Sequence, residues 1–138
     1  MSLTSVSTQR QTFRKNERLC SRAILQKLAL KGKNIHVHPL RMMWIPSVLP
    51  VKVPLQAAFS VPKRNFKSAV DRNRIKRRMR EAYRKNKSLL YALIPNSENQ
   101  YALLFVFTGK EMISYFDTEE KTKIILHRFA EDIQKNNS

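Results

Sequence analysis

Basic and amide side chains recur between positions 73 and 87 at spacings that would place them on one face of an α-helix. At about 100° per residue, six of them fall within one sector: Asn73, Lys76, Arg77, Arg80, Arg84 and Lys87. Arginine can bind a phosphate through two N–H groups at once, and lysine adds a compact positive charge. No acidic residue lies in this sector, whereas a solvated helix face usually alternates Glu with Lys. The pattern predicts a surface that binds the phosphodiester backbone of RNA or DNA.

Side chains that could hydrolyse a phosphodiester bond are sparse. A nuclease that uses two metal ions needs clustered carboxylates, and the one close group is Asp117, Glu119 and Glu120. Acidic residues at a helix start interact favourably with its dipole, so we interpret this group as a helix N-terminus. His36 and His38 would share one face of a strand, but no third ligand accompanies them, which favours a structural role. We therefore expect no catalytic residue and no metal site in the protein.

The scarcity of cysteine and glycine excludes two further kinds of site. Cys20 is the only cysteine, so there is no intramolecular disulfide and no cysteine-based zinc cluster. We expect it to be a buried or half-buried small side chain. Gly32 and Gly109 are the only glycines, so no glycine-rich loop can cradle phosphates.

The basic face can be presented to a partner only if the opposite side of the same helix is anchored. Apolar side chains occupy that opposite sector: Ile75, Met79, Ala82, Tyr83, Leu90 and Leu93. Ser68 is the predicted N-cap, with Asp71 three residues later in capping-box spacing. The helix is expected to end near Leu93, before Pro95. One helix would thus pack on a core and display cations on its other side.

The remaining elements are predicted from caps, prolines and hydrophobic periodicity. They are a helix from the Ser21 cap to Lys31 ended by Gly32, strands at Leu40–Ile45, Leu55–Val61 and Tyr101–Phe107, and a last helix opening at Asp117 or Thr118 with Ile125, Phe129 and Ile133 inward. With one further short strand, the order is α-β-β-(short β)-α-β-α, an α+β sandwich of helices and one sheet.

One face of the strand at 55–61 is expected to stay open. Leu55, Ala57, Phe59 and Val61 point one way, while Gln56, Ala58 and Ser60 form a small, partly polar surface on the other. No zipper heptads, zinc ligands or helix-turn-helix accompany the basic helix, which disfavours reading of DNA grooves. A partly polar sheet face beside a basic helix suits unpaired nucleotides better.

Charge and composition point to a polyanionic partner. The chain has 138 residues and a formal net charge of +17, and the stretch from Lys63 to Lys87 holds 12 Lys/Arg against two acidic residues. No apolar run of about 18 residues could span a bilayer, and the start has no apolar signal segment. We expect a cytoplasmic protein with no membrane partner, a flexible tail at 1–12, one RNA-binding domain at 13–134 and a flexible end at 135–138.

Two segments resemble the signature of the bacterial ribonuclease P protein component family. They read FSVPKR at 59–64 and AVDRNRIKRRMREAY at 69–83, and the hallmark triplet stands as Arg72-Asn73-Arg74. The segment FRKNE at 13–17 is similar to the family's N-terminal pattern, and the resemblance covers Phe13 to about Ile133. This chain departs from the family in lacking a glycine before Ala69, in ending the last strand without Ala-Arg, and in replacing aromatic residues of the first helix.

The resemblance implies a fold and a function. The family fold is an α-β-β-β-α-β-α sandwich with one mixed sheet and a left-handed βαβ crossover. Its members are protein subunits that help a catalytic RNA remove the 5′ leader of precursor tRNA, with Mg²⁺ held mainly by the RNA subunit and the substrate and with no organic cofactor. The implied partners are the catalytic RNA and precursor tRNA, and no DNA partner is expected.

The resemblance also implies positions for the contacts. The RNA-binding residues expected from the family motif, the basic helix face or both are Lys63, Arg64, Arg72, Asn73, Arg74, Lys76, Arg77, Arg80 and Arg84. Of these, Arg72 and Arg74 lie off the basic face and rest on the resemblance alone. The candidates for a cleft that binds the leader, chosen by position, are Phe13, Arg41, Met43 and Ser60.

Two other functions remain open from the residues alone. The first is a ribosomal or other structured-RNA-binding protein that uses the same helix and has no nuclease role. The second is a self-sufficient nuclease, which the scarcity of carboxylate clusters disfavours.

Overall fold

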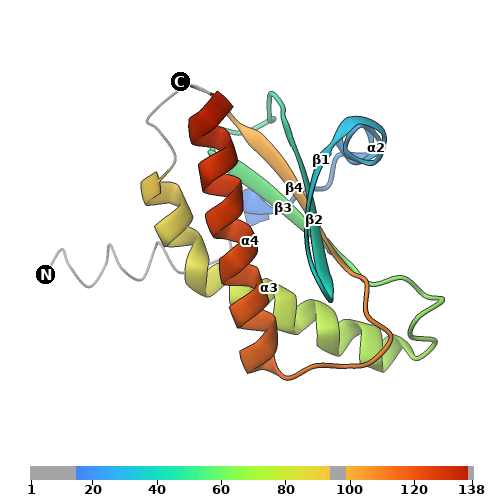
Figure 1. Ribbon diagram of the computed structural model, residues 1–138. Helices are drawn as coiled ribbons and strands as arrows, with labels where there is room; N and C mark the ends of the chain where they lie inside the picture. The colour runs from blue at the N-terminus through green and yellow to red at the C-terminus, as the bar shows by residue number, and fades with distance from the viewer. Residues whose placement is uncertain (1–14, 94–98, 137–138) are drawn as a thin grey trace, which may run out of the picture.

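A four-stranded sheet carries helices on both faces (Figure 1). The computed structural model describes residues 15–93 and 99–136. Along the chain the elements are η1 (Lys15–Glu17), α2 (Arg22–Lys31), β1 (Lys33–Val37), β2 (Leu40–Pro46), β3 (Leu55–Ser60), α3 (Ala69–Leu93), β4 (Tyr101–Phe107) and α4 (Tyr115–Asn136). The predicted α-β-β-β-α-β-α order of elements is confirmed, but the place of the short extra strand was wrong: it is β1, before β2, and does not follow the strand at 55–61.

The sheet is mixed, with strand order β1-β2-β4-β3. β1 pairs with β2 and β2 with β4 in antiparallel register, whereas β3 and β4 run parallel. A parallel pair needs a crossover connection, and α3 supplies it between β3 and β4. The left-handed sense of this βαβ unit stays a prediction from the family resemblance.

The two faces of the sheet pack against different helices. The larger core lies under α3 and α4 and is built around aromatic side chains, with Trp44, Phe105 and Phe129 each at most 1% exposed. A smaller cluster lies on the other face, where Leu28 of α2 packs with Met43 and Val106. The predicted strand Tyr101–Phe107 is confirmed with its bounds, and its central position between the two clusters explains its continuous apolar sequence.

Local signals placed most helix ends correctly. The Ser21 hydroxyl accepts a hydrogen bond from the Ile24 amide at the start of α2, and the Gly32 amide donates to the Leu28 carbonyl at its end. The Ser68 hydroxyl accepts from the Asp71 amide at the start of α3.

The predicted start of the last helix was wrong. α4 begins at Tyr115 rather than at Asp117 or Thr118, because the Ser114 hydroxyl caps it by accepting from the Asp117 amide. Its predicted inward residues, Ile125, Phe129 and Ile133, are confirmed as buried. The helix runs to Asn136, so regular structure passes position 134, the predicted end of the domain.

Two predictions about exposure were also wrong. Cys20 is exposed, because the chain turns at this point from the edge of the sheet into α2. Gln56 is 5% exposed rather than open, because the chain around Asn16 lies over it and accepts a hydrogen bond from its amide. Ala58 and Ser60, on the same face of β3, are half-buried. The predicted tail at 1–12 lies outside the described residues.

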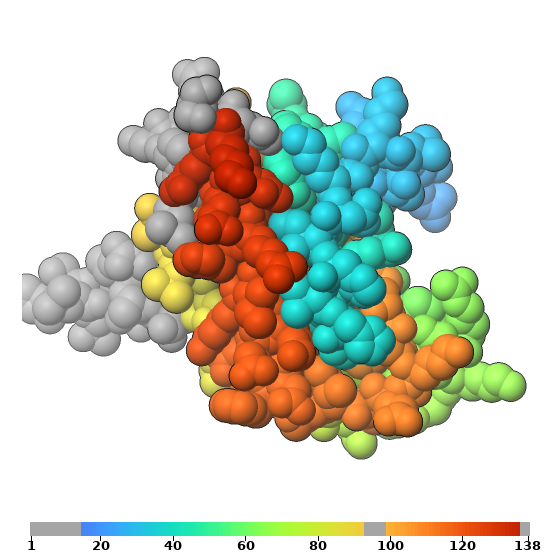
Figure 2. Space-filling model, viewed as in Figure 1, coloured from blue at the N-terminus to red at the C-terminus, as the bar shows by residue number. Residues whose placement is uncertain are grey.

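The described helices include none that is both long and apolar enough to cross a membrane. Figure 2 shows α4 across the front of the molecule beside β1 and β2, while α2 and the connection into α3 lie at one edge of this view.

The apolar face of α3 should account for much of the stability. Met79 is 1% exposed in the main core, so we expect Met79→Ala to lower the free energy of unfolding by about 2–5 kcal/mol, through lost burial and a residual cavity. Urea denaturation would measure the change. Leu89, on the same helix, is 65% exposed, so Leu89→Ala should change stability by less than about 0.5 kcal/mol. Equal losses in the free energy of unfolding for Met79→Ala and Leu89→Ala would contradict this orientation of the helix.

Candidate RNA interface

The outer face of α3 presents a row of cations on its N-terminal half. Asn73, Arg77 and Arg80 are exposed, and Lys76 is half-buried. The opposite face is buried, with Ile75, Met79, Ala82, Tyr83 and Leu90 each at most 3% exposed. The predicted two-sided helix is therefore confirmed over residues 73–80, and its cations are available to a polyanion.

The contact between Arg80 and Phe59 shows where the row of cations on α3 lies relative to the sheet. Its guanidinium carbon is 6.0 Å from the centre of the Phe59 ring, and Phe59 belongs to β3. β3 is an edge strand, so the cationic face of α3 runs beside the edge of the sheet. A cation held over an aromatic ring is oriented without being neutralised.

One cation of the basic face, Arg84, is paired with an acidic residue that lies beside the face. This side chain forms two hydrogen bonds to Glu81, at 2.9 and 2.6 Å, in an i,i+3 pair. The wheel placed Glu81 outside the basic sector, but side chains three positions apart on a helix can meet. Hydrogen bonds from Arg84 lower the pKa of the Glu81 carboxyl, so the carboxylate stays charged and offsets that cation.

The prediction that Lys87 belongs to the basic surface was also wrong. Lys87 is 1% exposed, and its Nζ lies 2.5 Å from Oε2 of Glu17, which is itself 7% exposed. The Tyr91 hydroxyl donates to the same carboxylate oxygen at 2.7 Å. Burial raises the pKa of the Tyr91 phenol, so this hydroxyl keeps its proton and remains a donor. Lys87 therefore secures the segment around η1 against α3 instead of facing a partner.

The other arginines of the family motif differ in their surroundings. Arg72 donates to the carbonyl groups of Phe66 and Lys67, at 2.7 and 2.9 Å, and so stabilises the turn before α3. Arg74 is exposed. Arg78, which was not a predicted contact, donates to the Ile113 carbonyl at 2.6 Å and joins α3 to the loop before α4.

The connection between β3 and α3 adds cations at the same end of the sheet. Lys63 and Arg64 are exposed, and they follow the half-buried Ser60 at the end of β3. The interface predicted from the sequence therefore combines the connection at 61–68 with the first three turns of α3.

The proposed leader cleft lies on the sheet face that α2 partly covers. Arg41 and Ser60 are half-buried on this face, whereas Met43 is 9% exposed within the cluster under α2 and offers little surface. Phe13 lies outside the described residues. α2 packs mainly on β2 and β4, and this placement leaves the strip along β3 less covered.

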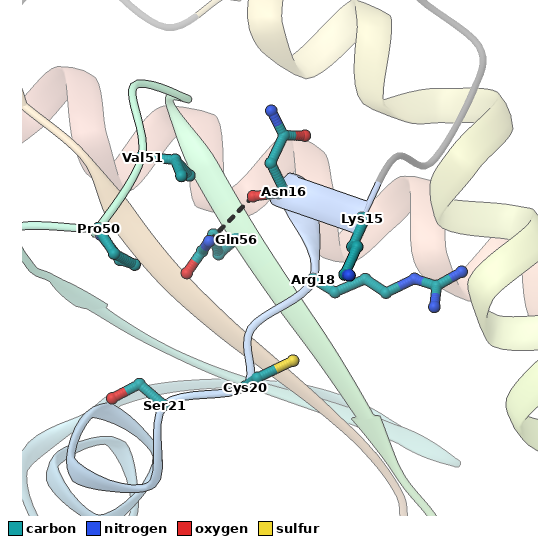
Figure 3. Close-up of a pocket in the computed structure, with 8 residues that line it drawn as sticks. All are labelled: Lys15, Asn16, Arg18, Cys20, Ser21, Pro50, Val51 and Gln56. Carbon is teal, nitrogen blue, oxygen red and sulfur yellow. Dashed lines mark hydrogen bonds between the residues drawn. The ribbon is translucent and has the colours of Figure 1, made fainter.

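A pocket that sequence reasoning missed lies at the other end of β3 (Figure 3). The chain from Lys15 to Ser21 forms one wall, the loop at 50–51 forms another, and Gln56 forms the floor. Arg18 forms a parallel bridge with Ala57, and the Leu19 amide donates to the Ala57 carbonyl. This segment thus covers the free edge of β3. The partners are about 40 residues apart in sequence, so no local pattern could reveal the pocket.

The residues considered for hydrolytic chemistry do not converge. Within residues 15–93 and 99–136, no three His, Cys, Asp or Glu side chains form a group that could hold a metal ion. Nε2 of His36 lies 3.3 Å from the Thr108 hydroxyl, and His36 and His38 are both exposed. Asp117 and Glu120 are exposed on the first turns of α4, in agreement with a helix N-terminus.

Comparison with known proteins identifies one family. The sequence profile described as ribonuclease P matches residues 13–130. The ribonuclease P protein component of Porphyromonas gingivalis is 31% identical over 119 residues, which cover 86% of this chain and 87% of that protein. The ribonuclease P protein component of Chlorobium phaeobacteroides is 30% identical over 126 residues, covering 84% and 86%.

Solved structures agree on the fold. The RNase P protein from Thermotoga maritima matches with a TM-score of 0.63 at 21% identity, covering 81% of this chain and 96% of that chain. An RNase P protein from Staphylococcus aureus matches with a TM-score of 0.61 at 17% identity, covering 80% and 93%. The α+β sandwich is therefore shared with these proteins.

The exposed cations of α3 should contribute to RNA binding through counterion release. We expect Arg77→Ala or Arg80→Ala to reduce the slope of log affinity against log salt by about 0.7–0.9 per lost phosphate contact. Titrating a folded RNA at several salt concentrations would measure the slope. Arg128→Ala on α4 removes an equal charge from an exposed site and should leave the slope unchanged. If both α3 variants keep the full slope, these side chains do not contact phosphates.

The buried Glu17–Lys87 pair should hold the N-terminal segment in place. Glu17→Gln leaves the Lys87 charge buried without its counter-charge, so we expect the free energy of unfolding to fall by about 3–5 kcal/mol. Adding Lys87→Met removes that charge and should restore much of the loss. Thermal and urea unfolding would test both variants. A loss of less than about 1 kcal/mol in the free energy of unfolding for Glu17→Gln would contradict an ion pair that is shielded from water.

Proposed function

This chain belongs to the ribonuclease P protein component family, and we propose that it binds the catalytic RNA of ribonuclease P and the 5′ leader of precursor tRNA. In this proposal it is the protein subunit of an endoribonuclease that matures the 5′ end of tRNA. Hydrolysis is performed by the RNA, and the protein contributes binding. The proposal places the protein in the cytoplasm, where precursor tRNA is processed.

The observation that carries the proposal is the one-sided display of cations at the start of α3. Asn73, Arg77 and Arg80 face outward from a helix whose other side is buried, and Lys63 and Arg64 extend the same surface. Arginine forks match phosphate oxygens in pairs, so a row of them along one helix favours a phosphodiester backbone. A folded RNA presents such a backbone.

Arg72 contributes to this surface indirectly. Because it donates to the Phe66 and Lys67 carbonyls, it fixes the turn that sets the position of Lys63 and Arg64 relative to α3. We therefore propose that Arg72 orients the interface, while Arg74, Lys76, Arg77 and Arg80 contact RNA. Arg84, which is paired with Glu81, would contribute less.

Single-stranded leader would bind where the sheet is least covered. Ser60 and Arg41 lie half-buried on the face that α2 covers only in part, next to the cations of the connection into α3. A strip of this kind fits one strand with its bases unpaired. The leader would thus pass from the cationic end of the sheet onto the strip along β3.

Ribonuclease P chemistry depends on Mg²⁺, and the described residues of this chain do not fit a site for it. They contain no cluster of three His, Cys, Asp or Glu side chains. We propose, as the family resemblance implies, that the RNA subunit and the substrate hold the metal. What the protein supplies is phosphate neutralisation, which lowers the repulsion that the assembled RNAs would otherwise experience.

Reconstitution would test the proposal. Purified protein is mixed with the cognate catalytic RNA and precursor tRNA at low Mg²⁺, and 5′ leader cleavage is followed with time. We expect cleavage to be strongly stimulated, and to require the RNA. Folded protein that gives no stimulation would overturn the proposal, whereas cleavage by the protein alone would indicate a nuclease of another kind.

Leader length separates this function from general RNA binding. Precursors whose leaders are shortened from the 5′ end should lose affinity for the holoenzyme, because contacts on the β3 strip disappear. A protein that binds only structured RNA would show the same affinity for every leader length. Equilibrium binding to the holoenzyme across the series measures the difference.

A further inference from the structure

Two histidines at the hairpin between β1 and β2 leave their imidazole rings exposed. His36 is in β1 and His38 directly follows the strand, so the two positions flank the half-buried Val37. Their ring centres are 6.2 Å apart, with 76° between the ring planes. Sequence reasoning favoured a structural role for this pair, because no third ligand accompanies it. The exposure of both rings argues instead for a role toward something in solution.

The separation of the two rings suits one shared metal ion. Two imidazoles that bind a tetrahedral ion through nitrogens at about 2.0–2.1 Å have ring centres about 5 Å apart. The observed separation therefore differs from the bound geometry by only about 1 Å. Because His38 is exposed, a small rotation of its side chain can close this difference at little cost.

Thr108 prepares His36 to act as a ligand. The Thr108 hydroxyl donates its single proton to the Pro39 carbonyl at 3.1 Å, so its oxygen is an acceptor toward Nε2 of His36, at 3.3 Å. We therefore assign the proton of the neutral His36 ring to Nε2, which leaves the lone pair on Nδ1. Histidines that bind metals commonly donate their other ring N–H to such a partner, and the hydrogen bond orients the ring.

The loop that carries Thr108 is held firmly against the hairpin. The Thr108 amide donates to the same Pro39 carbonyl at 2.7 Å. A Cβ atom at the next residue, Gly109, would lie 2.8 Å from Cβ of Pro39, so the loop after β4 can approach this closely only with glycine there. The hydrogen-bond partner of His36 is thus in place before any ion binds.

The surroundings decide which class of ion fits. Imidazole nitrogen binds Zn²⁺, Ni²⁺ and Cu²⁺ well, whereas Mg²⁺ prefers oxygen ligands in a near-ideal octahedron. Arg41 is the cross-strand partner of His36, and its guanidinium adds positive charge beside the pair. That charge opposes any cation held only by electrostatic attraction, so the site selects ions that form strong bonds to imidazole.

We propose that His36 and His38 bind one divalent transition-metal ion, such as Zn²⁺ or Ni²⁺, through Nδ1 of His36 and a ring nitrogen of His38. Solvent completes the coordination, and Thr108 is a positioning residue for the site. β1 and β3 are the two edge strands of the sheet, so the site lies at the edge opposite the strand beside the cations of α3. The inference is independent of the proposed function and of the Mg²⁺ that cleavage requires.

Calorimetry on the full-length protein without an affinity tag tests the site. Zn²⁺ and Ni²⁺ are titrated separately at constant ionic strength, with Mg²⁺ for comparison. We expect one transition-metal ion per chain and no comparable binding of Mg²⁺. His36→Gln and His38→Gln should each weaken the affinity by more than tenfold, since losing even an outer-shell partner commonly costs about 10–100-fold.

His127 provides the matched control. It is the third histidine of the chain and is exposed on α4, so His127→Gln removes an equivalent ring and should leave the affinity unchanged. Absence of binding by the unmodified protein would overturn the proposal. It would also be overturned if the His36 and His38 variants bind as tightly as the unmodified protein, because the ion would then be held adventitiously elsewhere.

A second pair of variants tests the role of Thr108. Thr108→Val removes the oxygen that accepts from His36, and we expect the metal affinity to fall by about 10–100-fold. Thr108→Ser keeps the hydroxyl and should restore the affinity. Urea unfolding of both variants without metal would separate a loss of the site from a loss of the fold. Equal metal affinity of two folded variants would overturn the assignment of Thr108 as a positioning residue.

Discussion

The whole interface depends on the burial of one face of α3 against the sheet and α4. A chain with a net charge of +17 repels itself, and it gains from concentrating its cations only if a partner of opposite charge binds them. α3 meets both demands, because its apolar side chains hold it in the core while its N-terminal cations point outward. The anchoring fixes the helix from which the charged side chains extend, so the cations stay on one side of the molecule.

The same helix also organises the N-terminal segment. Lys87 is withdrawn from the surface to bind Glu17, and Tyr91 donates to the same carboxylate. A buried ion pair contributes little net stability compared with apolar packing, but it is specific, because removing the charge of one partner leaves the other charge buried and unpaired. Here that specificity fixes a segment which covers the edge of β3 and forms one wall of the pocket. Lys87 thereby holds the segment that carries Lys15 and Arg18, and it is not available at the surface.

This arrangement divides the proposed work between protein and RNA. The described residues provide cations, a partly open strip of sheet and a pocket, but no cluster of three metal ligands. Such a surface can bind and orient a substrate that another molecule cleaves. Affinity for the leader would be set by the protein, and the reaction itself by the RNA.

Much of this could be determined from the sequence alone, because its signals act over a few residues. The Ser21 and Ser68 caps, the strand Tyr101–Phe107 and the two-sided character of α3 all follow from contacts within one or two turns, or from alternation along one strand. The family motif around Arg72-Asn73-Arg74 is equally local, and the profile match over residues 13–130 confirmed the family. What only the tertiary structure decided involves partners far apart in the chain. A helical wheel cannot distinguish Lys87 from Arg80, because Lys87 is removed from the surface by a carboxylate 70 positions away. The burial of Gln56, the exposure of Cys20 and the pocket between them depend on the same long-range contact of the N-terminal segment with β3, and the physical reason is that burial is a property of the folded neighbourhood rather than of residue type.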